Sequence, residues 1–432
     1  MHKTLKSTFI LFLIASIPFL GGLAQADDAA SSNSTRESQL IHLRSEKLKK
    51  LKPQKTGFFE KFFLSLEKTM GEKSLEGDVA TGSWFGPQVG IITPSSGLAV
   101  GAHVGKNIFQ ASAAYSFSSY QQYEFRIGKN APREQFFLVS SYTSDLYQTN
   151  FIQPRNGLFY YADVRFRDLN SEAFYGLGPD SALADRAAYE LKDATYSAVE
   201  GYQFGNWARL DVREGLYHSN INDQSSSTSP TISQAYDEAT APGLVDQPDF
   251  WNFSSSFLIE GRDVPQNPHH GGALAVSFSR YDDKDSNIFE FNRYTVDGRY
   301  YIPLGSIARM LALHYLSSFT DTSGGHEIPF YLENSLGGLD NLRGFAEYRF
   351  RDRDLMYMSA EYRLETASWM EISFIYETGK VFSRASDFDF QNLERSYGFG
   401  ARFKSGKGWL FRIEAGKSGE GWQVYFRVGP SF

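Results

Sequence analysis

Residues 408–418 read GWLFRIEAGKS and residues 421–432 read GWQVYFRVGPSF. In both stretches apolar and polar side chains alternate, which predicts β-strands with one apolar and one polar face. The polar faces carry full charges, and each apolar face holds a tryptophan near its start. The same period recurs upstream in three further segments, 354–366, 369–382 and 394–405. The last third of the chain is therefore expected to form consecutive amphipathic strands.

Two all-β folds would produce such strands. In a soluble sandwich the apolar face packs into the core, whereas in a transmembrane β-barrel it faces lipid and the charged face lines the lumen. The barrel is favoured because the polar face carries full charges and aromatic residues lie at strand ends on the apolar face, as in membrane girdles. These aromatic residues are Tyr362, Tyr376, Trp409 and Trp422. We expect an all-β membrane protein, with the soluble sandwich as the alternative.

The composition agrees with this interpretation. Phe, Tyr and Trp make up 16% of the 432 residues, yet beyond Ile17 no apolar run approaches the ~20 residues that a transmembrane helix needs. Only helices and closed barrels satisfy their backbone polar groups in lipid. The chain has no Cys, which excludes disulfides, thiolate nucleophiles and Cys-ligated metals. Its formal net charge of −7 argues against a nucleic-acid partner.

Residues 1–26 have the three parts of a secretory signal peptide. Lys3 and Lys6 form a positive n-region, Phe9–Ile17 an apolar h-region, and residues 24–26 (AQA) a cleavage site. An uncleaved N-terminal anchor is the alternative. Secretion together with a barrel pattern predicts a multi-pass protein of a bacterial outer membrane, with its N-terminus in the periplasm.

Residues 27–83 are expected to form a periplasmic segment that is partly helical and partly disordered. Residues 27–35 are small and polar, whereas apolar residues recur at helical spacing within 36–51 and 59–70. Basic residues outnumber acidic ones in the helical part. This stretch fits a helix on anionic lipid or a plug in the barrel, and equally a solvated linker.

The barrel is expected to have sixteen strands, and an even number places both chain ends on one side. The expected strands are 97–105, 107–118, 119–129, 134–144, 158–168, 187–203, 207–217, 251–262, 271–283, 287–302, 307–318, 354–366, 369–382, 394–405, 408–418 and 421–432. Long outer loops then alternate with short inner turns, as in bacterial barrels, and only 145–157 is too long for a turn. Phe432 ends the chain at the lipid-facing parity of Phe426 and Val428, and these three residues form the expected C-terminal barrel signal.

The loop before 354–366 contains LGGLDNLRGF at residues 336–345. It resembles the GG…RGF signature of the BamA/TamA family of outer-membrane barrels (the bacterial surface antigen domain), in the loop where that family carries it. Further resemblances are GRD…NP…GG in 261–272 with Arg262, Asp263 and Pro268 in an inner turn, AEYR at 360–363, YETGKVF at 376–382 with Glu377 where Asp is usual, and FYGLGP at 174–179. Together they cover most of residues 84–432, the expected barrel domain.

The best-known members of that family carry folded polypeptide-transport-associated domains before the barrel. Residues 27–83 lack the βααβ-type pattern of such a domain and are too few to hold one. The resemblance therefore implies a family member without these domains.

The resemblance also implies a contact between the long loop and the barrel wall. Arg343 of the loop needs a partner, and Glu361 and Glu377 fall at inward parity on neighbouring strands. A loop folded into the lumen would bring the Arg343 guanidinium to both carboxylates. The expected loop-to-wall clasp comprises Leu342, Arg343, Gly344, Phe345, Glu361 and Glu377, with the glycine permitting close approach and the phenylalanine packing on the wall. The alternative is a set of separate, solvated lumen charges.

No enzymatic site stands out. His269 and His270 are adjacent but lie in an expected inner turn, where such a pair is more often incidental than a metal site. His314 with a nearby Ser is a conceivable hydrolase site, because outer-membrane barrels with Ser-His-Asn sites exist, yet no spacing singles out a nucleophile. We expect no enzymatic activity, cofactor or metal.

The resemblance implies a role in assembling outer-membrane proteins or in moving protein or lipid across that membrane. Such barrels are proposed to receive an incoming chain by β-augmentation at a weak seam between the first and last strands. Here the seam is expected between 97–105, which contains three glycines, and 421–432. Expected partners are outer-membrane lipids and either unfolded outer-membrane proteins or a periplasmic protein. The alternative is a passive, porin-like diffusion channel with a charged lumen.

Overall fold

The computed structural model describes residues 61, 83–106, 108–131, 137–139, 156–224, 226, 228–265, 267–306, 308–367, 369–405 and 408–428. The expected signal peptide and nearly all of the expected periplasmic segment lie outside the described residues, as does Phe432. Within the described part, no helix has both the length and the apolar character to cross a membrane.

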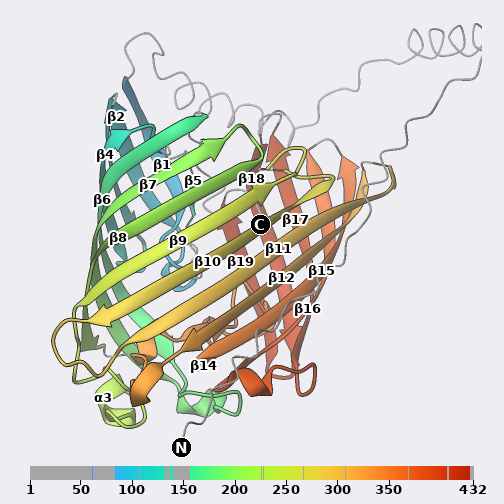
Figure 1. Ribbon diagram of the computed structural model, residues 1–432. Coiled ribbons are helices and arrows are strands. Elements are labelled where there is room, and N and C mark those ends of the chain that lie inside the picture. The colour runs from blue at the N-terminus through green and yellow to red at the C-terminus, as the bar shows by residue number, and fades with distance from the viewer. Residues whose placement is uncertain are drawn as a thin grey trace, which may run out of the picture. The chain divides into compact units, whose positions relative to one another are not determined.

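Sixteen antiparallel strands curve into a nearly closed barrel (Figure 1), which confirms the expected fold class. In chain order they are β1 (Ser83–Ile91), β2 (Ala99–Lys106), β3 (Phe109–Ser116), β4 (Gln121–Lys129), β6 (Gly157–Phe174), β7 (Ala187–Phe204), β8 (Ala208–Asp223), β9 (Phe250–Glu260), β10 (Gly271–Asp283), β11 (Phe291–Ser306), β12 (Arg309–Asp321), β15 (Asp354–Ala367), β16 (Met370–Phe382), β17 (Glu394–Ser405), β18 (Gly408–Ser418) and β19 (Gly421–Val428). Each strand pairs antiparallel with the next one in this order.

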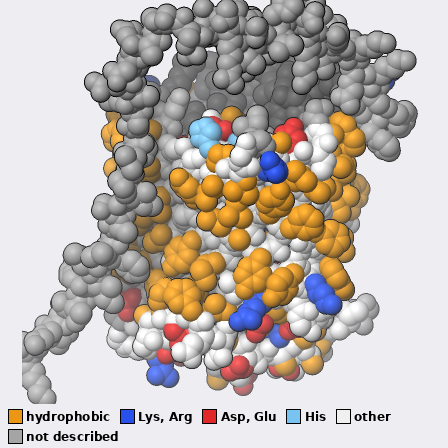
Figure 2. Space-filling view, turned by 90° about the vertical axis from the view of Figure 1, so that its right-hand side faces the viewer, with side chains coloured by type: hydrophobic (Ala, Val, Ile, Leu, Met, Phe, Trp, Pro, Cys, Tyr) orange, Lys and Arg blue, Asp and Glu red, His pale blue; other side chains and the backbone are white. Residues whose placement is uncertain are grey.

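The alternation of side chains places the apolar face outward and the charged face inward. Phe374 and Phe426 are 55% and 50% exposed, whereas Glu361 and Glu377 on the inner face are 0% exposed. A soluble sandwich would bury the apolar face instead, so this distribution decides between the two folds. Figure 2 shows hydrophobic side chains spread over the strands, with charged side chains gathered below them. The hydrophobic band is the surface that faces lipid.

The two ends of the barrel differ. One end, here called the turn end, carries short links such as those between β7 and β8 and between β15 and β16. The other, the loop end, carries long connections that contain η1 (Pro94–Ser96), η3 (Leu183–Asp185), α3 (Ile232–Ala235), η4 (Ser323–Gly325), η5 (Phe330–Leu332), η6 (Ala385–Asp387) and the hairpin of β13 (Asn334–Leu336) with β14 (Phe350–Asp352). The loop end lies at the bottom of Figure 1. Buried side chains from several loops and strands, among them Phe174, Ile232 and Phe330, pack there into one core.

The start of the barrel differs from expectation. The strands expected at 97–105, 107–118 and 119–129 correspond to β2, β3 and β4, and β1 precedes them. The sequence of β1, SWFGPQVGI, hides its strand character because Pro87 has no N–H to donate and Gly86 and Gly90 have low strand propensity. Proline is tolerated here because β1 lies at an edge of the continuous antiparallel sheet.

The strand expected at 134–144 was assigned wrongly to the wall. Of these residues the structure describes only Phe137–Val139, which form β5. β5 pairs in parallel with β1, through Val89–Phe137, Gly90–Leu138 and Ile91–Val139. Consequently residues 130–156, which connect β4 to β6, make one long connection that starts and ends at the turn end.

Candidate functional site

The long loop between β12 and β15 turns back against the inner face of the wall. Leu342, Arg343 and Phe345 are 0%, 1% and 2% exposed. Leu342 and Phe345 belong to an apolar cluster with Leu316 of β12, Leu355 and Tyr357 of β15 and Val381 of β16. The Phe345 ring also meets that of Phe350 edge-on, with centroids 5.2 Å apart. The motif of residues 336–345 is thus buried in the barrel.

The tip of this loop has an unusual backbone. Leu342 has a φ of 48°, in the left-handed region that a branched side chain rarely occupies. The turn is closed by a hydrogen bond from the N–H of Phe345 to the Leu342 carbonyl, at 2.9 Å. Complete burial of the Leu342 side chain helps to hold this conformation.

Arg343 binds two carboxylates of the wall. Its Nη1 lies 3.5 Å from Oε1 of Glu377 on β16, and its Nε lies 3.4 Å from Oε2 of Glu414 on β18. Its backbone N–H donates to Oε2 of Glu377 at 2.6 Å, and the Tyr357 hydroxyl donates to Oε1 at 2.7 Å. Burial lowers the pKa of Arg343, but Glu414 and Glu377 more than offset this and leave the pKa well above its ordinary value. The side chain therefore stays charged.

Glu361, the other expected partner of Arg343, belongs to the same network and joins it through Arg402. Its carboxylate binds Arg363, whose Nε is 3.2 Å from Oε1, and Arg402. Nη2 of Arg402 in turn lies 3.6 Å from Oε1 of Glu414. The second carboxylate beside Arg343 is thus that of Glu414, which corrects the expected pairing. Glu414 has inward parity in the sequence, but which strands the loop reaches depends on the curvature of the wall.

Gly344 lies directly on β18. Its N–H donates to Oγ of Ser396 at 2.7 Å, and its carbonyl accepts from Oγ of Ser418 at 2.7 Å. A Cβ at position 344 would lie 2.5 Å from the carbonyl carbon of Lys417, and a Cβ at Gly416 would lie 2.3 Å from the Arg343 carbonyl oxygen. Only glycine at both positions permits this approach of the two backbones.

The loop also reaches the last strand, which the sequence analysis did not foresee. The Tyr425 hydroxyl donates to the Phe345 carbonyl at 2.7 Å, and Nη1 of Arg427 lies 2.7 Å from Oδ1 of Asp340. Both side chains have inward parity on β19, and this parity was the available signal. The clasp therefore spans β16, β17, β18 and β19.

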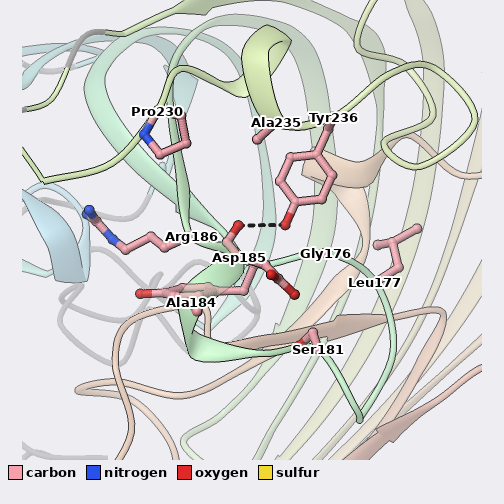
Figure 3. A pocket seen from close by; sticks show the side chains of 10 residues that line it. Gly176, Leu177, Ser181, Ala184, Asp185, Arg186, Pro230, Ala235 and Tyr236 are labelled. Atoms are coloured by element: carbon pink, nitrogen blue, oxygen red, sulfur yellow. Dashed lines mark hydrogen bonds between the residues drawn. The ribbon is translucent and has the colours of Figure 1, made fainter.

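The FYGLGP segment, 174–179, supports the same loop from the loop end. The N–H of Gly178 donates to the Arg351 carbonyl at 2.7 Å, and the Arg349 guanidinium lies 5.2 Å from the centre of the Tyr175 ring. The segment also borders a pocket of about 380 Å³ between η3 and α3 (Figure 3). There the Tyr236 hydroxyl donates to the Asp185 carbonyl at 2.7 Å and so links the two loops.

The other expected motif residues lie away from the clasp. In the turn between β9 and β10, Arg262 is buried and donates from Nε to Oε1 of Glu260 at 2.8 Å. Asp263 accepts the N–H of His269 at 2.9 Å, and Pro268 is buried in the same turn. Phe426 points outward, and the side chain of Val428 lies outside the described ones, as does Phe432. Within the described chain, no three His, Asp or Glu side chains are grouped to hold a metal ion.

The seam lies between β1 and β19, so the expectation that 97–105 forms one side of it is wrong. Gly101 and Gly105 lie on β2, where they pair with Ala114 and Gln110 of β3. β19 contacts β1 and β5. Among the described residues, however, no paired register joins β19 to either of them, whereas every other pair of neighbouring wall strands has one.

Comparison with known proteins identifies the family. A sequence profile of the Omp85 superfamily domain matches residues 121–432. The fold is similar to that of BamA from Haemophilus ducreyi lacking POTRA domains 1–3, with 15% identity, a TM-score of 0.56, and coverage of 82% of this chain and 70% of that one. CdiB from Escherichia coli has 13% identity and a TM-score of 0.50 over 81% of this chain, which spans 63% of CdiB. No curated protein matches significantly. The chain belongs to the Omp85 superfamily and is an outer-membrane β-barrel of the BamA/TamA type.

Proposed function

We propose that this barrel inserts proteins into the outer membrane, or passes proteins through it, at the seam between β1 and β19. The Omp85 fold is consistent with outer-membrane protein assembly or secretion. The observation that carries the proposal is the seam itself, where the described residues of β1 and β19 share no paired register. An edge strand with unpaired backbone groups is a template for another strand.

The two sides of the seam suit different tasks. The clasp fixes β19 through Tyr425 and Arg427, whereas none of its described contacts reaches β1. Opening the seam would therefore move β1 and leave β19 in place. Because an unpaired edge in lipid is costly, an incoming strand that pairs with β1 is stabilised there.

We further propose that the turn end faces the periplasm, so that the N-terminus is periplasmic and the loop end faces the outside. Apart from residues 130–156, the long connections gather at the loop end, and bacterial barrels carry their long loops outside. Clients that arrive from the periplasm would then meet the seam from the turn end. The proposed partners are outer-membrane lipids around the band and an unfolded protein at β1.

The test is depletion of the protein, followed by quantitative profiling of outer-membrane proteins, secreted proteins and lipids. We expect a subset of barrel or secreted proteins to fall while lipid composition holds. A change confined to lipids would contradict the proposal. Conductance in planar bilayers tests the alternative of a porin-like diffusion channel. Such a channel should conduct steadily, and the wild-type protein and R343A should conduct equally. That result, with an unchanged protein profile, would favour the porin.

A further inference from the structure

The two edges of β1 are occupied in different ways. One edge pairs antiparallel with β2 from Ser83 to Gly90. The other pairs in parallel with β5 and only through its last three residues, Val89–Ile91. In the part of the chain that the structure describes, no other strand has a paired register with this second edge. The seam edge of β1 is thus covered toward the loop end by a segment of the same chain.

β5 is not a wall strand. It contacts β19 as well as β1, so it lies at the seam. Wall neighbours in this barrel are antiparallel, and β5 is the exception because it runs parallel to β1. It is three residues long, whereas its neighbours β1 and β19 have nine and eight.

The position of β5 requires the chain to leave the wall after β4. Ala131 packs on the cluster of Phe159, Tyr161 and Val199, and its carbonyl accepts a hydrogen bond from Nε2 of Gln110 at 3.5 Å. Five residues separate Ala131 from Phe137, so six Cα–Cα steps join them. An extended chain of that length spans about 20 Å, which equals the rise of β1 from Ser83 to Val89. This length matches the axial distance from the turn end to the loop-end part of β1.

The pairing of β5 is weak enough to be reversible. Three residues in parallel make only a few backbone hydrogen bonds, each of modest net stability, and parallel pairing is slightly less stable than antiparallel pairing. Its sequence, Phe-Leu-Val, nevertheless has high strand propensity. A longer strand that starts on Ser83–Pro87 gains more backbone pairs than β5 loses.

We propose that Phe137–Val139 is a self-strand, which occupies the receiving edge of β1 in the resting barrel and is displaced by an incoming strand. The inference rests on the proposed function and adds that β5 regulates access to the same edge of β1. The partner that this edge fits is an extended, β-prone segment that pairs first near the turn end and then replaces β5 residue by residue. Until such a segment arrives, the self-strand keeps the loop-end part of the edge from pairing with other chains.

Disulfide trapping tests the contact between β1 and β5. The chain has no Cys of its own, so only the introduced cysteines can form a disulfide. V89C/F137C joins registered partners of β1 and β5, and V100C/Y115C joins registered partners of β2 and β3 as a positive control. A102C/F137C is the negative control, because Ala102 lies on β2, beyond β1. We expect oxidation of folded barrels in membranes to link the first two pairs and not the third. Failure of V89C/F137C while V100C/Y115C forms would overturn the self-strand.

Capture of a peptide strand by β1 tests whether β5 regulates access to this edge. The probe is a peptide with the sequence of residues 134–144 that carries a photo-crosslinker, with a scrambled peptide as its control. L138P removes a backbone N–H from β5 and should raise labelling of β1 about tenfold, the equivalent of about 1.4 kcal/mol of lost competition. Oxidised V89C/F137C should show little labelling and should regain it on reduction, which requires no further variant to fold. Equal labelling of L138P, oxidised V89C/F137C and reduced V89C/F137C would overturn the inference.

The two failures can be told apart. Absence of the 89–137 disulfide, with a depletion that still lowers barrel or secreted proteins, overturns the self-strand alone. A disulfide that forms, with a depletion that leaves those proteins unchanged, overturns the proposed function and with it the role assigned to β5.

Discussion

The two walls that meet at the seam are built differently. On one side, β16 to β19 are bound to the long loop through Glu377, Ser396, Glu414, Ser418, Tyr425 and Arg427. On the other side, β1 to β4 are eight or nine residues long, and the hydrogen bonds and ion pairs described for the clasp do not involve them. At the loop end, Oγ1 of Thr93 donates to Glu172 of β6 at 3.2 Å, and Ala99, Ala114 and Tyr120 belong to the apolar core that also holds Phe330 and Tyr331 of the long loop. The difference teaches that the barrel has one fixed and one loosely held seam strand.

Removal of the Arg343 side chain should have the largest effect on this difference. R343A removes the cation beside buried Glu377, whereas Glu414 keeps Arg402 and Arg412, and the cost is on the order of 3–5 kcal/mol. We expect the loop to leave the wall, the fixed side to become mobile and activity in a depleted strain to be lost. The temperature at which the folded barrel converts to unfolded mobility on a gel should fall.

R126A is the matched control, on the loosely held side. Arg126 is a buried lumen arginine of β4 whose Nε lies 2.7 Å from Oδ1 of Asp163, and β4 lies across the seam from the clasp. R126A removes a cation from Glu124 as well as from Asp163, but Asp163 keeps Arg213, at 3.2 Å, as a second cation. A smaller effect of R126A supports the comparison, whereas equal effects would mean that any buried lumen charge matters and that the clasp is not special.

A methyl group at Gly344 should have an intermediate effect. G344A places a Cβ 2.5 Å from the backbone of β18 and should cost about 1–3 kcal/mol, because that backbone cannot yield without breaking its ladder. The control is G298A on β11, whose Cβ would meet only Leu274, at 3.7 Å. We expect G344A to keep partial activity and to show a lower gel-transition temperature. G298A should resemble wild type in both measurements. Equal behaviour would show that the close approach is dispensable.

The smallest effect should come from pH, at Glu333 in the same loop. Burial raises its pKa from 4.5 to about 8, although Arg293 and Arg353 oppose this and Asp352 and Asp354 add to it. Protonation therefore stabilises the folded loop. This contribution is complete below pH 4.5 and is lost as the pH rises through about 8. The gel-transition temperature should fall by a few degrees between pH 6 and pH 9.5 in wild type and by less in E333Q, where other buried carboxyl groups still lose their protons. Parallel curves would contradict the assignment.

The sequence predicted strands best where the period of two was uninterrupted. From β9 to β18 most observed boundaries agree with the expected ones within a few residues, because one face must meet lipid and the other the lumen. β1 was missed because Pro87 and its glycines mask the pattern. Residues 134–144 were misplaced because strand propensity does not reveal which edge a strand joins. Arg343 and Glu377 were expected at the site from the motif and parity, whereas Glu414, Ser418 and Tyr425 depend on how the wall curves around the loop.

The order of synthesis gives the clasp a consequence for folding. Residues 340–345 precede every strand to which they hydrogen-bond, and these bonds span 74 residues from Gly344 to Ser418, 80 from Phe345 to Tyr425 and 87 from Asp340 to Arg427. Contacts of such long sequence separation form late, because the entropy of closing the intervening chain is lost before they are made. Docking of the loop is therefore complete only when the final strand is in place, and a truncated barrel, unable to dock it, would be recognisable to proteases by its exposed loop.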